Sequence, residues 1–180
     1  VNLVYIESYG RSSIDNPEHA AAHVSTLRSI ESRLRAQGLA MRSGFLTAPM
    51  VGGQSWLTHG SIATGLWLDT QGRYRAMLAS PRRTLFHFAR DAGFRTLAVM
   101  PAITRAWPEG DFFGFDRILD AEALGYAGEP YNWVTMPDQY TLEVYDRLER
   151  TPAPSPVFSQ IALISSHAPW TPVPPLIPWE

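Results

Sequence analysis

The clearest candidate for chemistry in this sequence is Ser55, which follows Gly52-Gly53-Gln54 and opens a segment, about residues 55–66, that we predict to be helical. A hydroxyl at a helix N-terminus lies in the positive field of the helix dipole, near N–H groups that have no partner inside the helix. Such a position suits an anion, or a nucleophile that must lose its proton. On this segment alone, a Gly-rich turn with Ser55 as a helix cap is an equally good interpretation.

Three further polar residues follow strands that we predict from short apolar runs. Glu7 comes directly after residues 1–6, and His167 comes shortly after residues 157–164. Arg105 lies in the loop that follows a third run, residues 94–100. Since the carboxyl ends of parallel strands meet at one edge of a sheet, where ligands of α/β proteins bind, we expect these side chains to converge there with Ser55.

The residue types suggest chemistry on a phosphate or sulfate group. The oxygens of Glu7 and Ser55 are hard ligands for a divalent cation, which would lower the pKa of the hydroxyl and stabilise a transferring anion. The guanidinium of Arg105 offers two parallel donors to phosphate or sulfate oxygens. His167 could hydrogen-bond the substrate or donate a proton. Each of these signals alone is common, so their order along the chain carries the interpretation.

The elements that would position these residues alternate between helices and strands. Apolar residues at helical spacing predict a helix over residues 17–37, and Ser80-Pro81 is predicted to start another as N-cap and first residue. Residues 45–50 are predicted to be extended, residues 101–136 irregular, and Pro137 to open a further helix. We therefore expect an α/β fold, a three-layer α/β/α sandwich with a mainly parallel sheet, in a single domain over residues 1–180 with no internal boundary.

Composition excludes several classes of function. The formal net charge of -2 and the absence of a basic stripe argue against nucleic acid as a partner. The sequence contains no cysteine, which rules out thiol nucleophiles, disulfides and cysteine-ligated metals. His19 and His23 are one helical turn apart and could bind a metal, but a solvated helix face is the simpler interpretation, because no third ligand is near. His87 is expected to pack within its helix.

Five segments of the chain, taken together and in order, resemble the alkaline phosphatase superfamily. They are Asn2-Leu3-Val4-Tyr5-Ile6-Glu7-Ser8-Tyr9-Gly10, Gly52-Gly53-Gln54-Ser55-Trp56, Thr104-Arg105-Ala106-Trp107, Phe113-Gly114-Phe115-Asp116 and Ser165-Ser166-His167-Ala168-Pro169-Trp170. The nearest branch is similar to the sulfatase-like membrane phosphotransferases, which include lipoteichoic acid synthases and phosphoethanolamine transferases. The resemblance implies that Glu7 and Ser55 are metal ligands and that Ser55 is the nucleophile, in a place usually taken by threonine. It also implies substrate-binding roles for Arg105 and His167.

The same resemblance implies a cofactor, a substrate class and a location. The cofactor is a divalent metal (manganese, zinc or magnesium), and the substrate is a small anionic or lipid-headgroup ester. The full-length protein to which this domain would belong is expected to be membrane-anchored, with the domain on the extracytoplasmic face, periplasmic or at the cell surface. The family completes its metal site with an Asp-His pair downstream of the segment at His167. Because the chain ends before such a pair, we expect a C-terminally truncated domain with weak or no metal binding.

Two departures from the family narrow the expected substrate. Relatives that transfer glycerol phosphate tend to carry His-Gly where this chain has Met100-Pro101. The resemblance therefore does not predict glycerol phosphate as the headgroup of the substrate. The lack of cysteine, and of a Pro-x-Arg sequence after Ser55, argues against a formylglycine sulfatase.

Two rival interpretations stay open. The order Ser55, Asp138, His167 would suit the triad of a serine hydrolase, although Leu57 stands where the nucleophile elbow needs its second glycine. Alternatively, the domain is a non-catalytic fragment or scaffold that keeps the fold without turnover.

Overall fold

The computed structural model describes residues 1–151 and 155–179. The described residues group into two compact units: Val1–Ser8 together with the stretch that begins at Pro49, and Tyr9–Ala48. The first unit holds the sheet and every residue considered for catalysis. The expectation of a single domain without an internal boundary stays a prediction.

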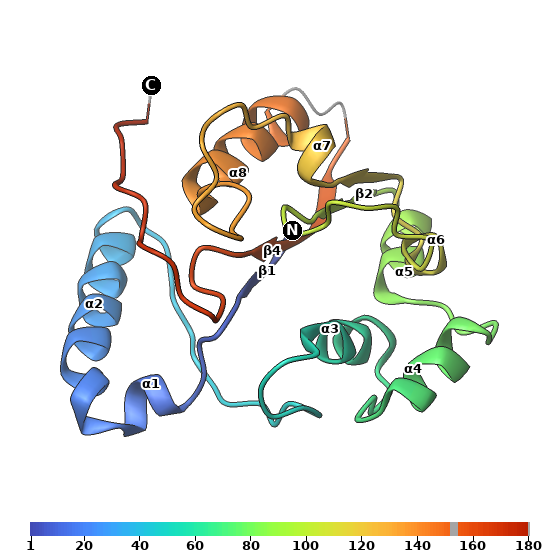
Figure 1. Ribbon diagram of the computed structural model, residues 1–180, viewed down its shortest axis with the longest axis horizontal. Helices are drawn as coiled ribbons and strands as arrows, with labels where there is room; N and C mark the ends of the chain where they lie inside the picture. Colours follow the sequence, from blue (N-terminus) through green and yellow to red (C-terminus); the bar gives the residue numbers. More distant parts are fainter. Residues whose placement is uncertain (152–154, 180) are drawn as a thin grey trace. The chain divides into compact units, whose positions relative to one another are not determined.

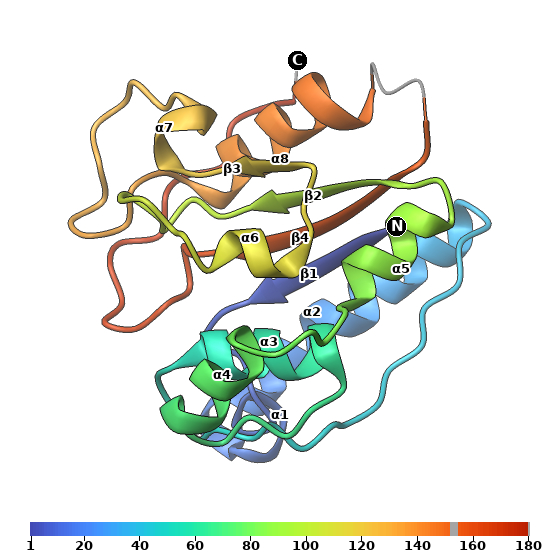
Figure 2. The same cartoon turned by 90° about the vertical axis from the view of Figure 1, so that its right-hand side faces the viewer.

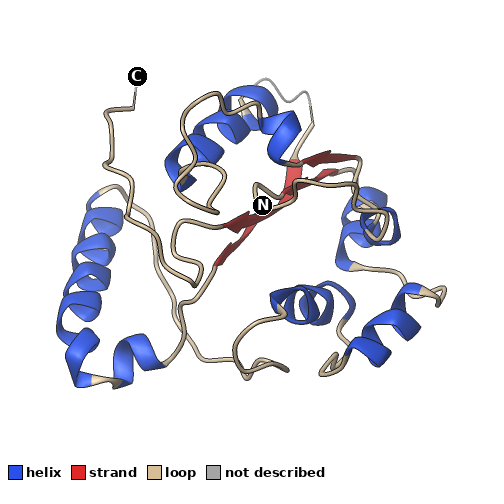
Figure 3. Ribbon diagram, in the orientation of Figure 1, coloured by secondary structure: helices blue, strands red, loops and turns tan. Residues whose placement is uncertain are grey.

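A four-stranded parallel sheet forms the centre of the first unit (Figures 1 and 3). Its strands are β1 (Asn2–Ile6), β2 (Arg95–Val99), β3 (Arg117–Leu119) and β4 (Val157–Leu163), in the spatial order β1-β4-β2-β3. Val4 of β1 pairs with Ile161 of β4, which in turn pairs with Val99 of β2. All pairs are parallel, so the four carboxyl ends lie at one edge.

Helices cover both faces of this sheet (Figure 2). On one face, α7 (Ala121–Leu124) and α8 (Asp138–Tyr145), which continues into the π-helical turn η1 (Asp146–Arg150), share a core with the odd-numbered residues of β4. On the other face, α3 (Ser55–Thr64), α4 (Gln71–Leu78), α5 (Leu85–Asp91) and α6 (Gly110–Phe113) form a second core, against which Phe158 packs. The predicted α/β fold with a parallel sheet between helix layers is confirmed.

The second unit contains α1 (Ser12–Asp15) and α2 (Pro17–Ala36). The side chain of Asn16 caps α2 by accepting a hydrogen bond from the backbone N–H of Glu18 at 3.0 Å, and Pro17 occupies the first helical position. The predicted helix is confirmed, with His19 and His23 on it. No helix in the two described stretches combines the length and apolar character needed to cross a membrane.

The prediction that Ser80-Pro81 starts a helix is wrong. The Ser80 hydroxyl instead donates to the carbonyl of Met77 at 2.6 Å, and so closes the end of α4. Helix α5 begins at Leu85, where the Thr84 N–H donates to Nδ1 of His87 at 3.1 Å in a capping box. His87, expected to pack only, is therefore part of this cap.

The prediction that residues 101–136 are irregular is wrong in part, because α6, β3 and α7 lie within them. Each of these elements is only three or four residues long, too short to show a periodic apolar pattern in the sequence. Residues 45–50, expected to be extended, form no strand.

Candidate active site

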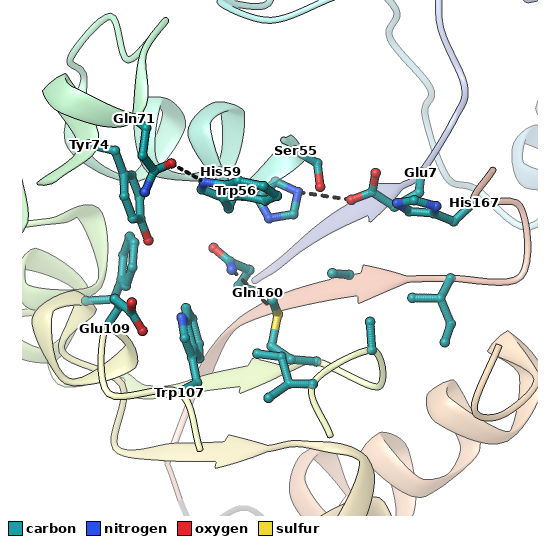
Figure 4. Close-up of a pocket in the computed structure, with 16 residues that line it drawn as sticks. Glu7, Ser55, Trp56, His59, Gln71, Tyr74, Trp107, Glu109, Gln160 and His167 are labelled. Carbon is teal, nitrogen blue, oxygen red and sulfur yellow. Dashed lines mark hydrogen bonds and ion pairs between the residues drawn. The ribbon is translucent and has the colours of Figure 1, made fainter. Parts of the chain in front are cut away.

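A cavity of about 370 Å³ lies at the carboxyl edge of the sheet, on the face covered by α3 (Figure 4). Glu7, Ser55 and His167 line it, as the sequence predicted, together with residues of α4, β4 and the loop after β2. The structure thus brings three of the four candidate residues to one cavity.

Glu7 follows β1, and its backbone is fixed to the segment after β4. The Ser166 hydroxyl donates to the Glu7 carbonyl at 2.6 Å. The next residue, Ser8, has a positive φ of 59°, and its hydroxyl accepts a hydrogen bond from the N–H of Ala168 at 3.0 Å. The Glu7 side chain is 13% exposed and lies 3.4 Å, Oε1 to Nε2, from His59.

Two opposing effects set the pKa of Glu7. Burial, the largest single effect, raises the pKa, because it disfavours the charged carboxylate. A hydrogen bond and charge from His59, a hydrogen bond from Ser55 and the charge of His167 together outweigh burial. The net pKa of Glu7 therefore lies below its ordinary value, and Glu7 is an anion at neutral pH.

Ser55 is presented by a turn of unusual backbone geometry. Gly52, Gly53 and Gln54 all have positive φ angles, of 69°, 65° and 51°. Glycine adopts this region without strain, which explains the two glycines before the helix. Ser55 is the first residue of α3, and its hydroxyl points toward the Glu7 carboxylate in Figure 4.

His59 is a site residue that the sequence reasoning missed. It lies one helical turn after Ser55 and so on the same face of α3, a spacing that was visible in the sequence. The residue is 8% exposed, and its ring packs against that of Tyr5 with centroids 3.9 Å apart. Because His59 contacts Glu7, it helps to fix where the carboxylate points.

His167 and Arg105 differ in their placement. His167 lines the cavity, with its ring edge-on to Trp133 at 4.9 Å. Arg105 is exposed in the loop after β2 and is not part of the cavity wall. Its substrate-binding role stays a prediction.

Asp138, the acid of the rival triad, is engaged with the backbone. Its Oδ1 accepts hydrogen bonds from the N–H groups of Ile164 and Ser165, at 2.8 and 3.0 Å. In the described part of the chain, its carboxylate makes no hydrogen bond to His167 and does not line the cavity. The residue therefore orients the end of β4, and the geometry of a serine hydrolase triad is not formed.

The donors present fit part of a metal site. The carboxylate of Glu7 and the hydroxyl of Ser55 are adjacent hard oxygen donors, which suit a divalent cation. Among residues 1–151 and 155–179, no group of three or more histidine, aspartate or glutamate side chains is arranged to hold a metal ion. Glu7 and Ser55 would thus supply only some of the ligands of a bound cation.

Comparison with known proteins identifies one family. The model of the sulfatase family matches residues 3–177, nearly the whole chain. No curated protein and no solved structure matches the chain significantly.

Proposed function

The chain belongs to the sulfatase family, and from that premise we propose that it is the catalytic part of a metal-dependent hydrolase or transferase that uses Ser55 to take up a phosphoryl- or sulfuryl-type group from an ester. Of the two groups, the phosphoryl type is favoured by the resemblance to lipoteichoic acid synthases and phosphoethanolamine transferases. The same resemblance supports a small anionic or lipid-headgroup substrate. It also supports a membrane-anchored parent that works on the extracytoplasmic face.

One observation carries the proposal: Ser55 is the first residue of α3, its hydroxyl points toward the Glu7 carboxylate (Figure 4), and both residues line one cavity with His167. The helix start offers unpaired N–H groups and a positive field to the oxygens of the transferring group. A divalent cation held by Glu7 and Ser55 would lower the pKa of the hydroxyl and balance the charge of the substrate.

The residues of this chain divide the reaction between them. The Ser55 hydroxyl releases its proton to solvent, its oxygen forms a bond to the phosphorus or sulfur atom, and the bond between that atom and the ester oxygen breaks. We assign to His167, which lines the same cavity, the binding of the substrate and the donation of a proton to the departing alcohol. In the second half, water or an acceptor alcohol takes the group from Ser55 and restores the free hydroxyl.

Replacement of Ser55 tests the proposal. We expect S55A to lower the hydrolysis of p-nitrophenyl phosphate esters by about a thousandfold or more, since the nucleophile is lost. S55T keeps a hydroxyl and should retain most turnover, and S25A, an exposed serine of α2, is the matched control. Mass spectrometry of the quenched reaction should find a phosphoryl adduct on the peptide that contains Ser55. Unchanged turnover in S55A would remove Ser55 from the mechanism, whereas the absence of turnover in the wild type would favour the scaffold interpretation.

Chelation separates this proposal from a metal-independent hydrolase. A serine triad enzyme keeps its activity in excess EDTA, whereas the proposed enzyme loses it and recovers when Mn²⁺, Zn²⁺ or Mg²⁺ is added back.

A further inference from the structure

We propose that Gln160 forms a second subsite in this cavity, where its side-chain carbonyl accepts a hydrogen bond from a hydroxyl or ammonium group on the alcohol part of the ester. The inference rests on the proposed function for the identity of the ligand as an ester. It assigns a specificity-determining role to a residue that has no part in the reaction at Ser55.

Gln160 is a buried polar residue without a partner for its carbonyl. It lies in the middle of β4, lines the cavity and is 2% exposed. Within the described residues, its Oε1 has no hydrogen-bond partner. Since buried polar groups in folded proteins are almost always hydrogen-bonded, an orphan acceptor beside a cavity indicates a partner that enters the cavity.

Met100 decides which way the amide is turned. The Nε2 of Gln160 lies 3.8 Å from the sulfur of Met100, which is a weak acceptor and cannot donate. The reversed amide would put two acceptors, the carbonyl oxygen and the thioether, against each other. The carbonyl of Gln160 is therefore the group left to bind a donor.

The location of Gln160 matches the alcohol part of a bound ester. Figure 4 shows its amide pointing from β4 into the space between Trp107 on one side and the α3 residues on the other. Ser55 and Glu7 lie toward one end of the cavity, and Glu109 lies toward the other. An ester group held at Ser55 would thus direct its alcohol part toward Gln160.

The charge of the cavity wall favours a hydrogen-bond donor over an acceptor. Two carboxylates, Glu7 and Glu109, line the cavity; His59 and His167 lie at the Glu7 end, and none of the described lining residues is an arginine. Glu109 acts on the ring of Tyr74 nearby: burial and then the charge of Glu109 raise the pKa of Tyr74 to about 12. Aromatic faces of Trp56 and Trp107 add surfaces that attract cations and C–H groups.

NMR titration of the full chain with matched esters tests the inference. The probes are O-phosphoethanolamine, which carries an ammonium group, glycerol 1-phosphate, which carries hydroxyls, and propyl phosphate, which carries no donor, each with the same concentration of Mg²⁺. We expect one or both donor-bearing esters to bind about three- to tenfold more tightly than propyl phosphate, the range for one neutral hydrogen bond. The stronger of the two identifies the donor. The side-chain amide signal of Gln160 should move with that ester and not with propyl phosphate, a readout that needs no variant.

A pair of matched substitutions identifies Gln160 as the origin of the preference. Q160M keeps the length of the side chain and should abolish the preference while it leaves the binding of propyl phosphate unchanged. Q139M makes the same change outside the cavity, where the Gln139 amide bonds the backbone of Ile177, and should keep the preference. An equal preference in Q160M, or none in the wild type, would overturn the inference alone. Failure of all three esters to bind would overturn the proposed function as well.

Discussion

Buried polar side chains are paired differently at the two ends of the parallel sheet. At the amino end, Glu149 is fully buried and forms ion pairs with Arg95 and Arg117, each with an N–O distance of 2.5 Å. At the carboxyl end, the contact of Glu7 with His59 is longer, 3.4 Å, and the carbonyl of Gln160 has no partner in the described stretches.

Asp116 extends the closed network at the amino end. Its Oδ2 accepts hydrogen bonds from both the N–H and the hydroxyl of Thr96, at 2.8 and 3.0 Å. These contacts tie the starts of β2 and β3 together, although Nε of Arg95 and Oε2 of Glu149 make no hydrogen bond within the described residues apart from the ion pair between the two side chains. The carboxyl end keeps acceptors available, which costs stability but allows recognition. A polar group that is paired within the fold stabilises it, and one that is left open is a candidate for function.

The largest expected effect is at the closed end. We expect E149Q to lower the free energy of unfolding by about 3 kcal/mol, the low end for breaking a buried ion pair, because Arg117 is 51% exposed and can be rehydrated. Ester binding at the other end should be unchanged. Urea denaturation measures the loss, and E143Q, which removes an exposed pair with Arg147, should cost no more than about 0.5 kcal/mol. Equal losses of unfolding free energy in E149Q and E143Q would show that the buried ion pairs of Glu149 stabilise the fold no more than an exposed pair does.

The next effect is at the carboxyl end of the sheet, where we expect a substitution to lower turnover more than stability. H59F removes the ring nitrogen that contacts Glu7, and we expect ester turnover to fall about ten- to a hundredfold, as for partners that orient a metal ligand. H59Q retains an N–H donor and should recover part of the rate. Initial rates with and without added Mn²⁺ measure both. If H59F keeps full activity, His59 serves only to pack against Tyr5.

The smallest effect concerns Glu109 and Tyr74, which line the cavity away from Ser55 (Figure 4). In E109Q the pKa of Tyr74 should move from about 12 toward, but not to, its ordinary 10.0, since burial is the larger cause and persists. The ionisation of Tyr74 is followed by the ultraviolet absorbance of the phenolate as the pH is raised. The part of this absorbance that is missing in Y74F belongs to Tyr74.

The sign of the linked pH dependence follows from the raised pKa. Neutral Tyr74 contributes its full stability below about pH 10 and loses it as the pH rises through about 12. In E109Q this loss should still begin near pH 10 but be smaller and complete at a lower pH. An unchanged Tyr74 pKa in E109Q would mean that Glu109 does not act on this part of the cavity.

The sequence by itself determined three of the four strands, β1, β2 and β4, their parallel arrangement and the convergence of Glu7, Ser55 and His167, but it missed the short strand β3. These depend on apolar runs and on the rule that parallel strands end at one edge, both of which are local patterns. The segment at Phe113-Gly114-Phe115-Asp116 was recognised as a family mark, but its structural role, holding Thr96, needed the fold.

Only the tertiary structure decided which polar groups are paired. Gln160 is, with Ser159, one of two polar residues in the mostly apolar strand β4. The sequence does not say that, among the described residues, its carbonyl has no partner while that of Gln71 is bound by Trp56. Likewise, Asp138 is held by the end of β4, and Arg105 is off the cavity wall. Pairing depends on which side chains meet across strands and helices far apart in the chain. That information is absent from the local spacing that made Ser55 recognisable.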